Sequence, residues 1–312
     1  WAVIRFSPSS FTIGYLLPLD FLFSVWFFLI TNRVLMGVCK ASGFWAGQWT
    51  MDKKYGAATA FGGFIIIGIL YIWMMRRDIV IMFKSAFFNS KTKIDDSAEG
   101  LSYKTAFIGL IVSFIFLVSF AVILLGTSVQ WAILYFGVLV LLAVATARTS
   151  AESGNTANRV GGGVNFEGYV LIPMLGQNLI GMNSIAGTGY LWNITMLPIQ
   201  GSCYMALHSW KLADDANCHR RSISKGMLLS GALSLIVFFV GSLIVCYKWS
   251  GRYGYARYGE YGFTNLLPAA VQGTLQPDST LRNFFLGGAV TTAVLFYLKA
   301  IFAWWPLHPI GF

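Results

Sequence analysis

Charged residues are scarce in this chain. Of its 312 residues, 11% are Asp, Glu, Lys or Arg, whereas 56% are hydrophobic and 16% are aromatic. In soluble domains about a quarter of the residues are charged and about half are apolar. The composition therefore excludes an ordinary water-soluble domain and predicts a protein whose surface faces the lipid bilayer.

The motifs of several enzyme classes are also missing. The four cysteines, Cys39, Cys203, Cys218 and Cys246, are scattered without CxxC spacing and predict free thiols. The sequence contains no HExxH motif and no nucleophile elbow, and the glycines at 161–163 lack the Gly-Lys-Ser/Thr of a phosphate loop. These absences predict that the protein is not an enzyme and holds no cofactor.

A nucleic-acid surface is not indicated, although the formal net charge is +10. The basic residues are spread over the segments between apolar blocks, whereas nucleic-acid binding requires them in one patch or stripe. We therefore expect the lipid bilayer, and no nucleic acid, as the partner of this chain.

Long apolar runs are what the sequence does contain. A helix needs about 20 apolar residues to cross a hydrocarbon core of about 30 Å, and blocks of this length predict six spans, at 11–30, 57–75, 105–125, 131–147, 227–247 and 284–303. The short turn at 126–130 makes the third and fourth spans an antiparallel hairpin. The predicted fold class is an all-α polytopic transmembrane helix bundle.

The predicted organisation is one transmembrane domain over residues 1–312. It includes a loop and re-entrant segment at 149–226 and an extramembrane loop at 248–283. Because the chain starts at Trp1 and stops just after the last span, we expect a fragment of a larger protein. Its missing N-terminal part would then be a partner of this chain.

The stretch 169–199 is apolar enough to enter a bilayer, but Pro173, Pro198 and several glycines, amides and hydroxyls interrupt it. Lipid-facing backbone must be fully hydrogen-bonded, so such breaks favour an interior, broken or re-entrant segment over a full span. The full span remains the alternative.

Lysine and arginine are distributed unevenly across the predicted spans. Placing Arg5, 76–104 and 148–225 on the inside gives 13 basic residues there, against 8 outside at 33–54 and 248–282. The positive-inside rule then predicts that the chain enters its first span from the cytoplasm.

Several strings resemble a known family. They are 14–20 (GYLLPLD), 24–28 (SVWFF), 95–106 (DDSAEGLSYKTA), Ala147-Arg148 with Ala151-Glu152, 208–214 (HSWKLAD) and 304–311 (WWPLHPIG). Together they resemble large bacterial multi-spanning membrane proteins of unknown function. The resemblance implies further spans before Trp1, a short membrane tail after Phe312 and a place in the bacterial inner membrane. The layout is also similar, at the level of fold, to oligopeptide-transporter-type carriers.

Asp20 and Lys299 are the charged residues that the spans themselves contain. A carboxylate within an apolar span suggests an ion or substrate path, and burial would raise its pKa as proton coupling requires. Pro18 would break the helix beside it. The structural alternative is that Asp20 caps a broken helix or pairs with a cation. Lys299 would either meet Asp20 or extend towards the headgroups.

Neutral polar residues of the broken segment are the second candidate group, because they can bind a polar solute without burying charge. Their alternative role is adhesion between helices. The candidates are Gln177, Asn178, Asn183, Ser184 and Asn193.

Histidines in the loops complete the candidates. His208 and His219 lie near Asp214, Asp215 and Cys218, but their spacing matches no zinc pattern and Arg220-Arg221 would repel a cation. We therefore predict a solvated loop and no metal. His308 stands between Pro306 and Pro309, on a rigid turn beside the membrane anchor Trp304-Trp305; the pattern favours anchoring and a structural turn, and a proton relay is the alternative role of His308.

The leading hypothesis is a secondary carrier for a small polar or peptide-like solute, in which the helix breaks at 18–20 and 176–189 form one mid-membrane polar site and Asp20 is the proton-coupling group. The first alternative is a non-transporting scaffold or complex subunit whose aromatic outer loop, 247–261, binds another protein. The second is a membrane-embedded enzyme that uses His208, His219 or His308.

Overall fold

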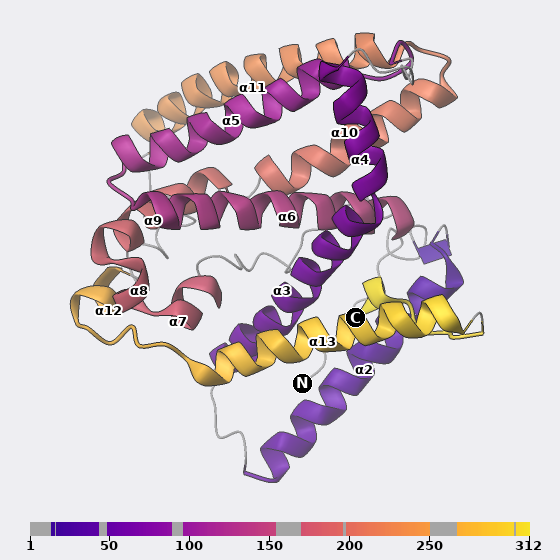
Figure 1. Ribbon diagram of the computed structural model, residues 1–312. Coiled ribbons are helices and arrows are strands. Elements are labelled where there is room, and N and C mark those ends of the chain that lie inside the picture. The colour runs from indigo at the N-terminus through magenta and orange to yellow at the C-terminus, as the bar shows by residue number, and fades with distance from the viewer. Residues whose placement is uncertain are drawn as a thin grey trace.

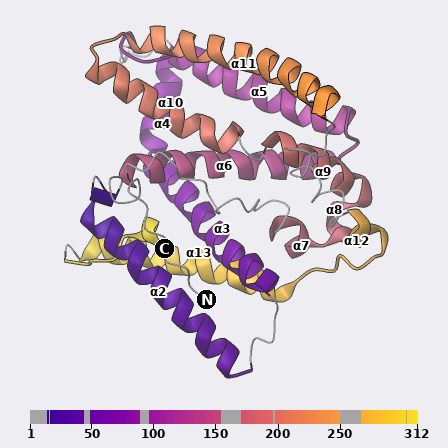
Figure 2. The ribbon, with the colours of Figure 1, turned by 180° about the vertical axis from the view of Figure 1, so that it is seen from behind.

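The computed structural model describes residues 14–15, 17–43, 49–88, 96–153, 170–195, 198–249, 267–302 and 304–312. Regular structure in these ranges is helical (Figures 1 and 2). The helices are α2 (Leu19–Ala41), α3 (Trp49–Met74), α4 (Arg76–Phe87), α5 (Tyr103–Ile123), α6 (Val129–Ser153), α7 (Ile172–Leu175), α8 (Gln177–Ile180), α9 (Met182–Thr195), α10 (Pro198–Asp215), α11 (Arg220–Trp249), α12 (Leu267–Val271), α13 (Ser279–Ile301) and the short 3-10 helix η5 (Pro309–Gly311).

Among the described residues, five helices are long and apolar enough to cross a membrane. They are Tyr55–Met74, Tyr103–Ile123, Val129–Ser153, Arg220–Val245 and Ser279–Ile301. Each overlaps one of the predicted spans, so the sequence-based prediction of an all-α membrane protein is confirmed. In α5 and α11 only 6% and 0% of the apolar stretch is buried, and these two helices therefore offer long surfaces to lipid.

The remaining predicted span, 11–30, differs from the structure. Residues 11–13 and 16 lie outside the described part, and the helix of this region, α2, begins at Leu19 and continues to Ala41. Residues 14 and 15 are helical and α2 begins after Pro18, so the helix is broken at this proline, as predicted, whereas Asp20 lies in the first turn of α2 instead of mid-span. A carboxylate in this position is stabilised by the positive end of the helix dipole.

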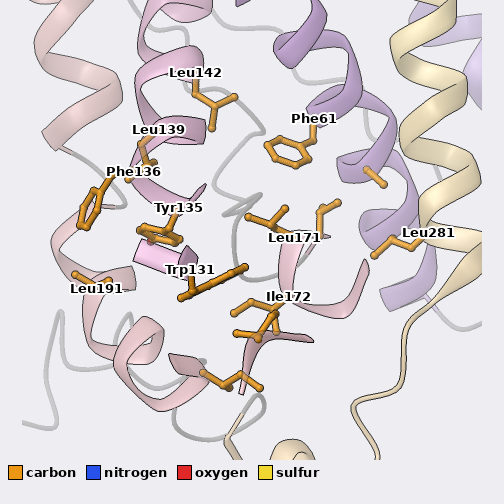
Figure 3. Close-up of a cluster of buried hydrophobic side chains, with 14 of the residues drawn as sticks. Phe61, Trp131, Tyr135, Phe136, Leu139, Leu142, Leu171, Ile172, Leu191 and Leu281 are labelled. Carbon is orange, nitrogen blue, oxygen red and sulfur yellow. The ribbon is translucent and has the colours of Figure 1, made fainter. Parts of the chain in front are cut away.

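The hydrophobic core surrounds the first half of α6. Trp131, Tyr135, Phe136 and Leu139 of this helix are buried against Phe61 of α3 and against the broken segment (Figure 3). Because large aromatic side chains contribute most of the buried area, this core holds α3, α6 and α9 together.

Backbone contact joins α3 to α13. A Cβ atom on Gly62 would lie 2.0 Å from the carbonyl oxygen of Phe285, and one on Gly288 would lie 2.0 Å from that of Thr59. Only glycine fits at such distances. Small residues that let helix backbones approach closely are typical of membrane helix pairs.

The segment 170–195 is broken, as predicted. The short helices α7, α8 and α9 are separated at Gly176 and Gly181, whose φ angles of 76° and 83° are in the region that favours glycine. Ile172, Ile180 and Ile185 are buried in the core. One side of the segment thus packs into the core while Leu179 and Tyr190 are exposed, and α9, with 14 residues, is too short to span a bilayer by itself.

Within 149–226, where the sequence predicts a loop followed by the broken segment, the structure also has helix α10 and the start of α11. The predicted solvated loop around His208 is therefore largely helical. Lys211 and Asp215 form an i,i+4 ion pair on this helix, with Nζ and Oδ1 3.1 Å apart.

The last elements bring several helix ends together. Contacts of α2 and α13 with η5, and of α3 with α6, place the first turn of α2 and the C-terminal turns of α3, α6 and α13 at one end of the bundle (Figure 1). Helix α4, which has no buried residue, continues from α3 at this same end and packs on α5. The charged residues of the spans meet here.

Candidate functional site

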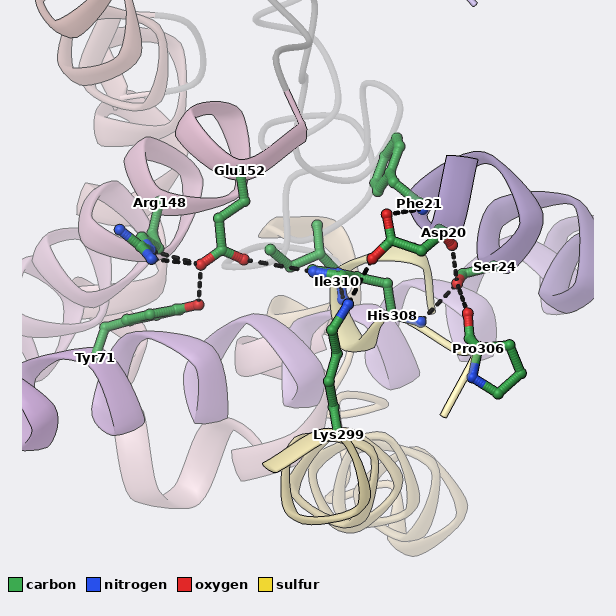
Figure 4. Close-up of polar contacts among 10 residues, drawn as sticks. All are labelled: Asp20, Phe21, Ser24, Tyr71, Arg148, Glu152, Lys299, Pro306, His308 and Ile310. Atoms are coloured by element: carbon green, nitrogen blue, oxygen red, sulfur yellow. Dashed lines mark hydrogen bonds and ion pairs between the residues drawn. The ribbon is translucent and has the colours of Figure 1, made fainter. Parts of the chain in front are cut away.

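Six ionisable side chains lie together where these helix ends meet (Figure 4). We call them the charged cluster: Asp20, Tyr71, Arg148, Glu152, Lys299 and His308. They come from α2, α3, α6, α13 and the segment before η5.

An ion pair between Asp20 and Lys299 forms one half of the cluster. The Nζ atom of Lys299 lies 2.6 Å from Oδ2 of Asp20, and Oδ1 accepts a hydrogen bond from the backbone N–H of Phe21 at 3.0 Å. The side chain of Asp20 is 46% exposed and that of Lys299 is 34% exposed. Two arrangements were expected for Lys299, a pair with Asp20 or extension towards the headgroups, and the structure has the pair.

This geometry reverses one sequence-based prediction. The hydrogen bond and the charge of Lys299 hold the pKa of Asp20 below its usual range, whereas mid-span burial was expected to raise it. The difference arises because Asp20 lies at the start of α2, outside the five candidate spans, with a cation in contact. In this conformation the carboxyl group is ionised at neutral pH.

Glu152 is the centre of the other half. Its Oε1 accepts a hydrogen bond from the Tyr71 hydroxyl at 2.5 Å and from Arg148 Nε at 2.7 Å, and Arg148 Nη2 lies 2.6 Å away. The guanidinium group of Arg148 also lies over the Tyr71 ring, 4.7 Å from its centroid. These contacts tie α3 to α6.

His308 stands between the two halves. Its Nε2 lies 3.8 Å from Oε2 of Glu152, while its Nδ1 accepts a hydrogen bond from the backbone N–H of Ile310 at 3.3 Å. Because Nδ1 is an acceptor, the proton of the neutral imidazole is on Nε2, facing Glu152. Burial, together with the charge of Lys299, lowers the pKa of His308, although Asp20 and Glu152 act in the opposite direction.

Ser24 fixes the backbone at this position. Its Oγ accepts a hydrogen bond from the His308 N–H at 2.6 Å and donates one to the Asp20 carbonyl oxygen at 2.5 Å. A Cβ atom on Gly311 would lie 2.5 Å from that of Ser24, so the C-terminal segment packs directly on α2. His308 is therefore held in place through α2, the helix that carries Asp20.

Sequence reasoning missed Tyr71, Arg148 and Glu152 as members of a site. A signal was present, because Arg148 and Glu152 have the i,i+4 spacing of a helical ion pair. Their partners lie on other helices, and a single sequence does not reveal these contacts.

The polar residues of the broken segment do not join the charged cluster. Ser184 is buried, and its Oγ accepts a hydrogen bond from the Ser128 N–H at 3.0 Å, at the N-terminal end of α6. The 21 residues between Trp131 and Glu152 correspond to about 30 Å of helix. Asp20 and the broken segment thus lie at opposite ends of the bundle and do not form the one mid-membrane site that the leading hypothesis expects.

The other predicted polar residues of this segment have different surroundings. Asn178 and Asn183 are exposed, and Oε1 of Gln177 is buried with no hydrogen-bond partner among the described residues. The side chain of Asn193 lies outside the described part.

The histidine region of α10 and α11 is organised by ion pairs. His208 Nε2 lies 3.0 Å from Ser150 Oγ of α6, while Arg220 binds both carboxylate oxygens of Asp214, at 2.7 and 2.6 Å. The hydrogen bonds from Arg220 hold the pKa of Asp214 below its usual range. Within the described ranges, no three His, Cys, Asp or Glu side chains gather as metal ligands.

A pocket of about 600 Å³ lies on the same three helices as Asp20, Tyr71 and Lys299, nearer the other end of the bundle. It is an open pocket lined by α2, α3, α13 and Phe312, and its polar lining consists of Thr31, Asn32, Tyr55, Thr59, Asn283 and Thr291. Neither Asp20 nor Asn183 is among its lining residues. The sequence did not predict this pocket, because its residues come from three separate helices.

Comparison with known proteins places the chain in a family. The model of a family of unknown function, DUF6785, matches residues 1–312. The chain belongs to this family. No curated protein and no solved structure matches the chain. DUF6785 membership agrees with the predicted resemblance to a membrane protein family of unknown function and carries no activity with it.

Proposed function

We propose that this protein is a secondary carrier of the bacterial inner membrane, which moves a small polar or peptide-like solute and is coupled to protons through the charged cluster. The observation that carries the proposal is the cluster itself. Ionisable groups are costly within membrane-spanning helices, to which Arg148, Glu152 and Lys299 belong, and chains of Asp, Glu and His side chains are typical of proton paths in transporters.

The arrangement of the cluster supports coupling. Asp20 is held ionised by Lys299, and these residues belong to different helices, α2 and α13. If the two helices separate during transport and the freed carboxylate becomes buried, the loss of its cation and of its hydration raises its pKa, so that it can take up a proton. Neutral His308 lies between Asp20 and Glu152 and provides a route for that proton.

The position of the pocket supports a carrier in the same way. Helices α2, α3 and α13 bear the pocket and also supply Asp20, Tyr71 and Lys299 to the cluster. A movement of α2 against α13 would therefore change the solute site and the ion pair together. Linked movement of this kind is what alternating access requires.

The test is solute-driven proton movement in liposomes. The purified protein is reconstituted around a trapped pH-sensitive dye, and a panel of dipeptides, amino-acid amides and sugars is added outside. We expect protein-dependent acidification with at least one solute, and its loss in Asp20→Asn. Asp214→Asn, which also breaks a carboxylate–cation pair, is the matched control and should retain it.

A further variant separates coupling from structure. The double exchange Asp20→Lys with Lys299→Asp keeps an ion pair at the same place. A structural pair would tolerate the exchange. A coupling carboxylate would not, because its proton would be carried by a different helix.

A scaffold or complex subunit is the second candidate function. It is favoured by α11, none of whose apolar stretch is buried, since such a surface can receive helices of another protein as well as lipid. Co-purification of a stoichiometric partner, together with absence of solute-driven proton flux, would favour this function over the carrier.

A further inference from the structure

The pocket between α2, α3 and α13 differs from an ordinary lipid-filled groove. A second hollow, of about 340 Å³ between α5 and α6, is lined by apolar residues such as Leu110, Phe114 and Val140, and none of its described lining residues has a polar side chain. The larger pocket, in contrast, presents amides and hydroxyls, which an acyl chain does not require.

Amide and hydroxyl groups define the polar side of this pocket. Asn32 and Asn283 can each donate and accept hydrogen bonds. Thr59 and Thr291 donate their hydroxyl protons to carbonyls of their own helices, at 3.0 and 2.8 Å, so towards the pocket they offer acceptors. A bound molecule would thus need both acceptor and donor groups, as an amide has.

Aromatic pairs define the apolar side. The rings of Tyr55 and Phe284 are stacked with centroids 4.9 Å apart, and those of Phe28 and Phe312 meet edge to face at 5.0 Å. All four residues line the pocket. Such surfaces bind flat apolar groups, and preferably aromatic ones.

The described lining of the pocket is uncharged. No Asp, Glu, Lys or Arg is among the described residues that line the pocket, although Arg33 and Arg282 are next in sequence to Asn32 and Asn283. A charged ligand would lose its hydration without gaining a partner, which costs more than a neutral ligand loses.

From these features we infer that the pocket binds an uncharged, aromatic, amide-containing solute of the size of a capped amino acid. The inference rests on the proposed carrier function and names the solute class of that carrier. A volume of about 600 Å³ falls within the range of small-molecule sites.

Two glycines allow the pocket to be filled without disturbing the helix contacts. A Cβ atom on Gly56 or Gly287 would meet nothing within 4 Å, and both residues line the pocket. Gly287→Leu and Gly56→Leu therefore place a side chain in the pocket from opposite helices. Gly109 of α5 also has open space around it and does not line the pocket, so Gly109→Leu is the matched control.

The probe is N-acetyl-phenylalanine amide, and its binding to the detergent-solubilised protein is measured by equilibrium dialysis. We expect saturable binding that weakens roughly tenfold or more in Gly287→Leu and in Gly56→Leu and is unchanged in Gly109→Leu. The anionic analogue N-acetyl-phenylalanine should bind roughly tenfold more weakly than the amide. If one of the two filling variants fails to fold, the other still tests the inference.

Three results of the binding assay would overturn the inference. They are absence of saturable probe binding, equal binding to wild type and to the folded filling variants, and equal or tighter binding of the anion. Phospholipid that co-purifies with the wild type, resists the probe and is lost in Gly287→Leu would also overturn it and assign the pocket to a lipid. The binding assay does not depend on transport. Its results therefore test the solute class alone, and the carrier proposal is tested separately by the liposome assay.

Discussion

Gly287 and Gly288 are adjacent in α13, yet alanine is expected to have opposite effects on stability at the two positions. A Cβ atom on Gly287 would meet open space, whereas one on Gly288 would lie 2.0 Å from the Thr59 carbonyl oxygen and 2.8 Å from its Cα. Alanine at either position gains up to about 1 kcal/mol of helix propensity. At Gly288 this gain is opposed by a backbone clash that no side-chain rotation can relieve.

The magnitude follows from overpacking. Inserting a methyl group into a well-packed contact costs about 1–3 kcal/mol, and the 2.0 Å distance places Gly288 at the upper end. We therefore expect Gly288→Ala to lower the free energy of unfolding by about 2 kcal/mol and Gly287→Ala to raise it by up to about 1 kcal/mol. In Tm, each kcal/mol corresponds to roughly 2 °C for a chain of this size.

Thermal unfolding of both variants in the same detergent, followed by circular dichroism at 222 nm, is the assay. The two Tm values should fall on opposite sides of the wild-type value and differ by about 6 °C. If Gly288→Ala were as stable as Gly287→Ala, the close approach of α3 and α13 would be wrong.

Three further predictions concern the polar contacts. Tyr71→Phe removes a hydrogen bond to a carboxylate and should cost about 1.5–3 kcal/mol in the free energy of unfolding, measured by detergent unfolding, and an unchanged stability would exclude that bond in the folded protein. The pKa of His308 is lowered in the folded protein, so protonation favours the unfolded state. The contribution of neutral His308 to stability is therefore complete above about pH 6.5 and decreases as pH falls through the folded pKa. His308→Gln should flatten the dependence of Tm on pH in this window, and an unaltered slope would contradict the burial of the ring. The pKa of Asp214 is lowered in the folded protein, so its carboxylate stabilises the fold above the ordinary pKa of 3.8, and this contribution is lost as pH falls through the folded pKa. Asp214→Asn should therefore reduce the loss of Tm in acid, and an acid response like that of wild type would argue against the pairing of Asp214 with Arg220.

The spans could be predicted from the sequence because hydropathy and length are local properties. Blocks such as 105–125 and 284–303 match α5 and α13 closely. The glycine-rich stretch was also predicted as broken, since Gly176 and Gly181 interrupt it in the sequence itself. The break at Pro18 was predicted as well, but the place of Asp20 in the first turn of α2 was not, because a proline can kink a span or precede a new helix and the residues around it do not decide between the two.

The sites were less predictable because their residues are far apart in the chain. Asp20 and Lys299 were both candidates, and their pairing was one of two alternatives. The contact of Tyr71 with Glu152 joins residues 81 positions apart, and nothing near Tyr71 in the sequence indicates it. The pocket depends on how α2, α3 and α13 pack, which their separate amphipathic patterns do not reveal.

Proton coupling through the charged cluster is tested most directly by solute-driven proton uptake into liposomes that contain the wild type, Asp20→Asn or Asp214→Asn. We expect uptake with wild type and Asp214→Asn, and none with Asp20→Asn at equal amounts of folded protein. Uptake by Asp20→Asn at the wild-type rate would contradict coupling through the charged cluster.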